Sequence, residues 1–98
     1  MKELGSRERS LLSRLSNPIK PVIRVGKNGL TEGIVNAIDE LLEKRELIKI
    51  KFVDFKDVKS EIATDISEKT GSMLVRVIGN IAIFYRESKK PENRKIML

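Results

Sequence analysis

The sequence lacks cysteine, histidine and tryptophan altogether. The absence of cysteine excludes disulfides and zinc fingers, and the absence of histidine removes the commonest transition-metal ligand. We therefore predict that the protein has no metal site and no cofactor. Catalysis would depend on carboxylate, lysine or serine side chains, and these form no recognisable catalytic constellation in the sequence. The sequence predicts a protein that is not an enzyme.

Long apolar runs are also missing. The longest uncharged apolar stretch, Ile81 to Tyr85, is far shorter than the roughly 20 residues that a membrane-spanning helix needs. The N-terminal residues 1–5 do not lead into the apolar run of a secretory signal. We expect a soluble, cytoplasmic protein with no membrane segment.

Aromatic side chains are scarce, with three phenylalanines and one tyrosine. The apolar pattern predicts that Phe52 and Phe84 lie in the core. Stacking on nucleic-acid bases would then have few side chains available. Recognition of a nucleic acid is expected to depend on phosphate, sugar and shape.

The 98 residues predict one domain, and its net charge of +6 is unevenly distributed. Residues 1–30 carry seven basic and two acidic side chains, residues 31–70 carry seven and ten, and residues 71–98 carry six and two. If the two termini lie near each other, the positive charge gathers on one side. Such a surface favours a polyanion, either a nucleic acid or an anionic membrane surface.

Apolar spacing and turn residues predict the order helix, strand, helix, strand, helix, strand, strand. Two right-handed crossovers make the first three strands parallel, and the Gly79-Asn80 turn makes the fourth antiparallel. We predict an α/β fold with a mixed four-stranded sheet in two layers, the first helix lying at the side or on the remaining face. Residues 1–86 form this domain, and residues 87–98 are predicted to be a loose basic tail.

The starts of all three helices carry specific expectations. Ser6 is predicted to cap the first helix, and Thr31 the second. Asp54 and Asp57 follow the second strand, and one of them is predicted to cap the third helix. The alternative for this acidic pair is a magnesium site.

The strongest candidate site is the segment Gly26-Lys27-Asn28-Gly29, between the first strand and the helix that begins near Thr31. Glycines allow positive φ and the close approach of an anion to main-chain N–H groups. The helix start adds free amides and the positive end of the helix dipole. The longer glycine motifs of nucleotide-binding folds are absent. The segment therefore predicts a phosphate clamp without a nucleotide cofactor, chemically similar to the Gly-x-x-Gly loop of KH domains, although there the loop joins two helices.

Basic side chains adjoin this loop. Lys20 and Arg24 precede it, and Arg7 and Arg14, seven residues apart, lie on one side of the first helix. We predict that all four help to hold a nucleic acid. For the two arginines of the helix, the alternative is an ordinary solvated face.

The whole pattern resembles the CRM domain family (chloroplast RNA splicing and ribosome maturation) in its stand-alone, YhbY-like form. The resemblance covers roughly residues 6–86. The matching motifs are Lys20-Pro21, Val25-Gly26-Lys27-Asn28-Gly29-Leu30-Thr31 with Gly33, Glu46-Leu47-Ile48-Lys49-Ile50-Lys51, Gly71, Val77-Ile78-Gly79 and Tyr85-Arg86.

The resemblance implies a fold like the C-terminal domain of bacterial translation initiation factor three, with strand order 1-2-4-3. It also implies RNA binding, association with precursors of the large ribosomal subunit in bacterial members, and a role as an RNA-binding module in plant organelle splicing factors. The family's glycine loop maps onto residues 26–29. Its basic surface maps onto Arg7, Arg14, Lys20 and Arg24, and the segment after Glu87 lies outside the shared pattern.

The leading hypothesis is a monomeric, non-catalytic protein that binds the backbone of structured RNA, namely ribosomal RNA during large-subunit assembly. Loop amides and Lys27 would contact phosphate, and Asn28 would bind a phosphate oxygen or a 2′-hydroxyl. The alternative is a protein–protein assembly module, in which the acidic second helix or the sheet face docks a ribosomal partner and the basicity is incidental.

Overall fold

The computed structural model describes residues 4–98, apart from the side chain of Lys56. Its elements follow the predicted order of helices and strands, with two short 3₁₀ turns in addition. They are α1 (Ser6–Ser16), β1 (Ile23–Val25), α2 (Glu32–Arg45), β2 (Leu47–Phe52), η1 (Lys56–Val58), α3 (Lys59–Thr70), β3 (Met73–Ile78), β4 (Ile81–Tyr85) and η2 (Pro91–Asn93).

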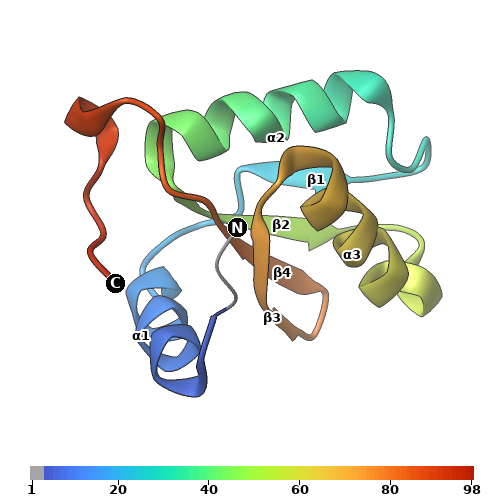
Figure 1. Cartoon of the computed structure of the whole chain (residues 1–98). Coiled ribbons are helices and arrows are strands. Elements are labelled where there is room, and N and C mark those ends of the chain that lie inside the picture. Colours follow the sequence, from blue (N-terminus) through green and yellow to red (C-terminus); the bar gives the residue numbers. More distant parts are fainter. Residues whose placement is uncertain (1–3) are drawn as a thin grey trace.

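The four strands form one mixed sheet in the order β1-β2-β4-β3 (Figure 1). β1 and β2 are parallel, and β4 is antiparallel to both of its neighbours. Both alternating sets of β4 side chains are buried, Ala82 and Phe84 on one face and Ile83 and Tyr85 on the other. The predicted order and the central position of the last strand are confirmed.

The two faces of the sheet carry separate apolar cores. On one face, α2 and α3 bury Ile38, Leu42 and Ile66 against β2 and β4. On the other face, α1 buries Leu12 against Ile83 and its neighbours. Of the two positions expected for the first helix, the structure therefore shows the one on the remaining face.

The helix starts agree only in part with prediction. The Thr31 hydroxyl accepts a hydrogen bond from the N–H of Ile34 at 3.2 Å, as expected of an N-cap. The expectation for Ser6 is wrong, because α1 includes Ser6 and its N-cap is Gly5. The prediction that Asp54 or Asp57 caps α3 is also wrong. The 3₁₀ turn η1 precedes this helix, and Val58 is its N-cap.

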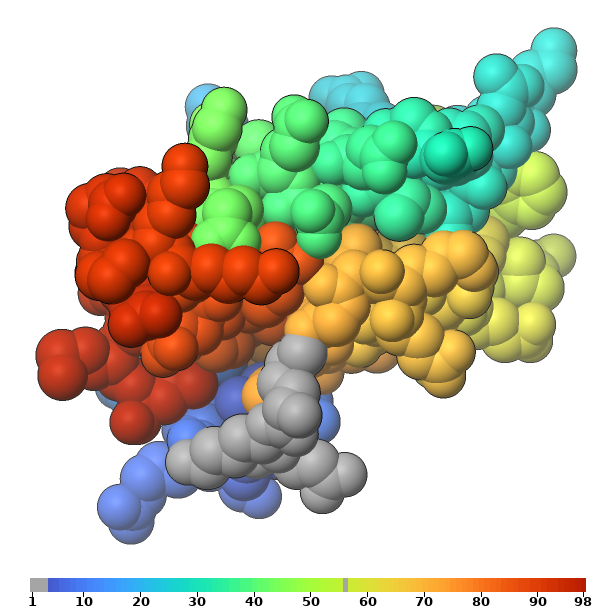
Figure 2. Space-filling view, turned by 45° about the horizontal axis from the view of Figure 1, so that its top comes forward, coloured from blue at the N-terminus to red at the C-terminus, as the bar shows by residue number. Residues whose placement is uncertain are grey.

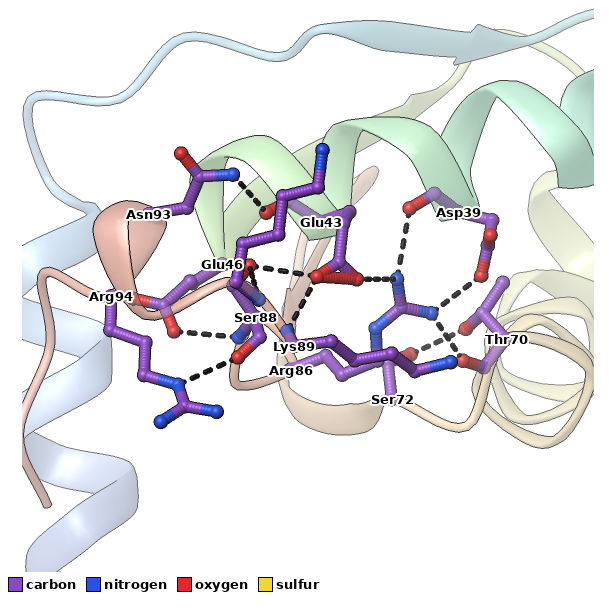
Figure 3. Close-up of polar contacts among 11 residues, drawn as sticks. Asp39, Glu43, Glu46, Thr70, Ser72, Arg86, Ser88, Lys89, Asn93 and Arg94 are labelled. Carbon is purple, nitrogen blue, oxygen red and sulfur yellow. Dashed lines mark hydrogen bonds and ion pairs between the residues drawn. The ribbon is translucent and has the colours of Figure 1, made fainter.

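Residues 87–98, predicted to be a loose tail, make specific contacts with the end of α2 (Figure 3). The carboxylate of Glu46 is fully buried and accepts hydrogen bonds from the backbone N–H groups of Ser88 (2.8 Å), Lys95 (2.7 Å) and Ile96 (3.3 Å). We call residues 87–98, held in this way, the C-terminal clasp. Buried carboxylates require such partners, so the clasp and Glu46 depend on each other.

A carboxylate within α2 also contributes to the clasp. Glu43 accepts hydrogen bonds from the Ser88 hydroxyl (2.8 Å) and the Lys89 N–H (2.5 Å), and Arg86 lies beside it at 3.4 Å. These two hydrogen bonds, with a smaller contribution from the Arg86 charge, hold the pKa of Glu43 below its ordinary value of 4.5. The ionised form of Glu43 therefore stabilises the folded chain.

This shift predicts an acid-sensitive contribution to stability. A carboxylate whose pKa is lower in the folded than in the unfolded chain stabilises fully above the unfolded value, and the contribution is lost as the pH falls through the folded value. We expect the urea midpoint of the wild type to fall below pH 4.5 more steeply than that of Glu43→Gln. Glu40→Gln, at an exposed position of the same helix, should keep the wild-type profile. Equal profiles for Glu43→Gln and the wild type would contradict this role.

Candidate nucleic-acid interface

The glycine loop forms a tight turn directly before α2. The N–H of Gly29 donates to the carbonyl of Gly26 at 2.9 Å, and Lys27 and Asn28, between them, are exposed. Of the two glycines, only Gly29 has a positive φ, at 67°. The left-handed conformation therefore explains the glycine at position 29 and not the one at position 26.

The loop also packs against the connection that follows β2. A Cβ atom added to Gly26 would lie 3.5 Å from a methyl group of Val53, and one added to Gly29 would lie 3.4 Å from the ring of Phe55. Figure 2 shows the loop (cyan) projecting at one end of the molecule, next to the connection between β2 and α3 (yellow). The candidate clamp is therefore built from two loops of the chain.

The basic side chains of the sheet all lie on one face. Residues paired across neighbouring strands point to the same side of a sheet, and the register pairs Arg24 with Lys51 and Lys51 with Ile81. Ile81 and Ile83 belong to the core beneath α1, so these basic side chains lie on the α1 face.

Two further basic residues join them. The register pairs both Lys49 and Arg76 with Ile83, which places them in the next row of the same face. A β-bulge between Leu74 and Arg76 brings Arg76 to this side. We call Arg24, Lys49, Lys51 and Arg76 the basic band. No strand contributes an acidic residue to it.

Arginines of α1 border the basic band. Nη1 of Arg9 donates to the carbonyls of Leu74 (2.7 Å) and Val75 (3.0 Å), and Nη1 of Arg76 contacts the Ser13 hydroxyl at 3.4 Å. These contacts hold α1 against the edge strand β3. A polar groove lies between the two elements, lined by Arg9, Ser10, Ser13, Arg14, Asn17, Val75 and Arg76.

The predicted site residues occupy two ends of the molecule. The glycine loop follows the carboxyl end of β1, whereas α1 covers one face of the sheet and is hydrogen-bonded to the edge strand β3. Arg24 lies in the basic band and Arg14 in the groove, so these two share a face. Arg7 on α1 and Lys20 before β1 are exposed, and neither lines the groove.

Sequence reasoning did not include Lys49, Lys51 and Arg76 in the site. The alternation of β2 places Lys49 and Lys51 on the face opposite Ile48, Ile50 and Phe52, so these two lysines could have been found. Arg76 carried no such signal. With regular alternation it would share the face of Leu74, which packs in the core under α2 and α3.

The helices α2 and α3, which form the layer on the other face of the sheet, carry an excess of negative charge. Acidic residues outnumber basic ones in both α2 and α3, the helices that cover the other face of the sheet. Part of this acidity is used internally, because Arg86 bonds both Asp39 and Glu43 (Figure 3). The charge asymmetry that the sequence shows along the chain becomes an asymmetry between two layers.

Within the described residues, none of the helices has the length and apolar character that a membrane-spanning segment needs.

A turn at a helix start and a cationic sheet face without strand carboxylates define a class of small α/β domain suited to polyanions. Comparison with known proteins identifies the family. The model of the CRS1 / YhbY (CRM) domain matches residues 4–86, and the chain belongs to this family.

Two bacterial relatives match almost the whole chain. The probable RNA-binding protein YqeI of Bacillus subtilis is 36% identical over 95 residues, which are 96% of each chain. An RNA-binding protein of Haemophilus influenzae is 35% identical over 99 residues, covering 100% of this chain and 97% of the relative. The solution structure of SAV1595 from Staphylococcus aureus has a TM-score of 0.80 and 38% identity, covering 97% of this chain and 100% of that one.

Proposed function

We propose that this protein binds the sugar–phosphate backbone of RNA. It does so as a cytoplasmic monomer and catalyses no reaction. The observation that carries the proposal is the basic band. All the charged side chains of the sheet are cations, and they all lie on the same face. Relatives that are named RNA-binding proteins support RNA as the polyanion.

The glycine loop and the basic band have complementary roles in this proposal. Exposed Lys27 and the free amides at the start of α2 bind phosphate, and Asn28 bonds a phosphate oxygen or a 2′-hydroxyl. Arg24 and Lys51 continue the contact along the sheet, and Arg14 and Arg7 extend it on α1. Contacts spread over such a surface favour structured RNA, and we propose ribosomal RNA in a precursor of the large subunit as the target.

Replacement of Lys27 by alanine tests the loop. We expect weaker RNA binding and a salt slope, log affinity against log salt concentration, that is lower by about one unit, because one phosphate contact is lost. The measurement is a fluorescence titration over a series of salt concentrations. Lys44→Ala removes the same charge from an exposed position of α2 and should leave the slope unchanged. An unchanged slope for Lys27→Ala would show that the loop does not bind phosphate.

The alternative is a protein docking surface on the acidic layer. It is favoured by the excess of carboxylates on α2 and α3, but Asp39 and Glu43 already bind Arg86. Competition with heparin separates the two functions. Heparin should displace an RNA held by phosphate contacts and should leave a protein partner on the acidic layer in place.

A further inference from the structure

One aromatic side chain of this protein is not used by its core. Phe52 and Phe84 are fully buried and Tyr85 is 5% exposed, whereas Phe55 is 41% exposed. These four residues are all the aromatic side chains of the sequence. The single exposed ring lies next to the glycine loop.

The contact between Phe55 and the loop is direct. A Cβ atom on Gly29 would lie 3.4 Å from Cε2 and 3.7 Å from Cζ of Phe55, so the ring edge packs against the glycine backbone. A Cβ at this position would make an ordinary van der Waals contact with the ring. The left-handed φ of 67° is therefore what requires glycine at this position, and the ring packs beside it.

The backbone of Phe55 is held in an unusual conformation. Its φ of 56° and ψ of 35° lie in the left-handed region, which is costly for a bulky residue. The Asp54 carboxylate accepts the N–H of Phe55 at 2.8 Å, and the carbonyl of Phe55 accepts the N–H of Val58 at 3.1 Å. These contacts hold the backbone of Phe55 in the left-handed conformation.

The surroundings of the ring favour an apolar, uncharged group over a phosphate. Val53 is 45% exposed and Val58 37% exposed, which adds apolar surface on either side of Phe55 in the chain. Asp54 and Asp57 are exposed in the same connection and repel phosphate. Next to the loop, a nucleotide would therefore place its phosphate at Lys27 and its base at Phe55.

We infer that Phe55 is a stacking platform for one base of the RNA whose phosphate is held at residues 26–29. The inference rests on the proposed function and adds to it a specificity that a backbone clamp alone lacks. A base inside a continuous duplex has no free face, whereas an unpaired base stacks on an aromatic ring. The protein should therefore prefer RNA with an unpaired nucleotide at the loop.

The test compares two RNA hairpins with the same stem, one with a loop of adenosines and one with abasic residues in the loop. The full-length wild type should bind the adenosine hairpin about tenfold more tightly, within the range for stacking of one base. Phe55→Leu should abolish this preference and leave the salt slope unchanged. Phe55→Trp should retain the preference. Thermal unfolding of both variants checks that the fold is intact.

The outcomes separate this inference from the proposed function. Equal affinity of the wild type for both hairpins, or an undiminished preference in Phe55→Leu, overturns stacking and leaves RNA binding in place. A Phe55→Leu variant that weakens both hairpins equally also overturns it, because the ring would then support the loop instead of a base. Failure of the wild type to bind either hairpin overturns both proposals.

Discussion

Replacement of Glu46 by alanine is expected to lower the free energy of unfolding by about 3 kcal/mol. The carboxylate is fully buried and accepts three backbone N–H groups of the C-terminal clasp. A buried donor left without an acceptor costs about 1–3 kcal/mol. In a domain of this size, a loss of about 3 kcal/mol corresponds to a fall in Tm of about 12–24 °C. Calorimetry or urea unfolding measures the effect.

Two further glutamate variants control this experiment. Glu46→Gln keeps the shape of the side chain but loses the negative charge and one acceptor oxygen, so its loss of stability should be intermediate. Glu40→Ala removes an exposed carboxylate of α2, the helix that precedes Glu46, and should change stability by less than about 0.5 kcal/mol. Equal stability of Glu46→Ala and Glu40→Ala would show that the clasp contributes nothing.

A double-mutant cycle measures the coupling between Glu46 and the C-terminal clasp. A chain that ends at Glu87 lacks all three donors to the Glu46 carboxylate. If these hydrogen bonds carry the stability, the truncation and Glu46→Ala should be strongly non-additive. Additive losses would mean that Glu46 and the C-terminal segment stabilise the fold independently.

Reversal of charge in the basic band should nearly abolish RNA binding. Arg24 and Lys51 are register partners and lie in the row of the band at the carboxyl end of β1. With both changed to glutamate, we expect an affinity loss on the order of 100-fold, since a hydrogen bond to a charged group contributes about 1.5 kcal/mol or more. The salt slope should fall by about two units.

A matched variant on the acidic layer controls for net charge. Lys44→Glu with Arg45→Glu, at the end of α2, also lowers the net charge by four, from +6 to +2. If only total charge matters, the two double variants should bind RNA equally weakly. A much smaller loss for the control is expected, because position on the α1 face is what brings a cation to the phosphate backbone.

Several features of the fold follow from signals only a few residues long. The alternation of β2 predicts its apolar and basic faces, and the hydroxyl of Thr31 predicts the start of α2. Gly79-Asn80 predicts the hairpin between β3 and β4, which the structure shows. The order of the strands in the sheet came from the family resemblance, because no short sequence signal specifies it.

The candidate site was predictable only in part, for a physical reason. The glycine loop has a local signature, but its neighbour Phe55 follows a different strand, and only the parallel pairing of β1 with β2 brings the two together. Likewise, no pattern marks the bulge that turns Arg76 to the α1 face. Such placements depend on how whole elements pack.

The sequence by itself thus determined the order of the elements, the turn at residues 26–29 and the excess of positive charge, because each depends on neighbouring residues. Only the tertiary structure decided the rest. It collected four strand cations on one face, left Phe55 exposed beside Gly29, and buried Glu46 beneath a C-terminal segment that composition alone describes as a loose tail. Each of these results from contacts between residues far apart in the chain, whose free energy depends on burial and geometry rather than on local propensity.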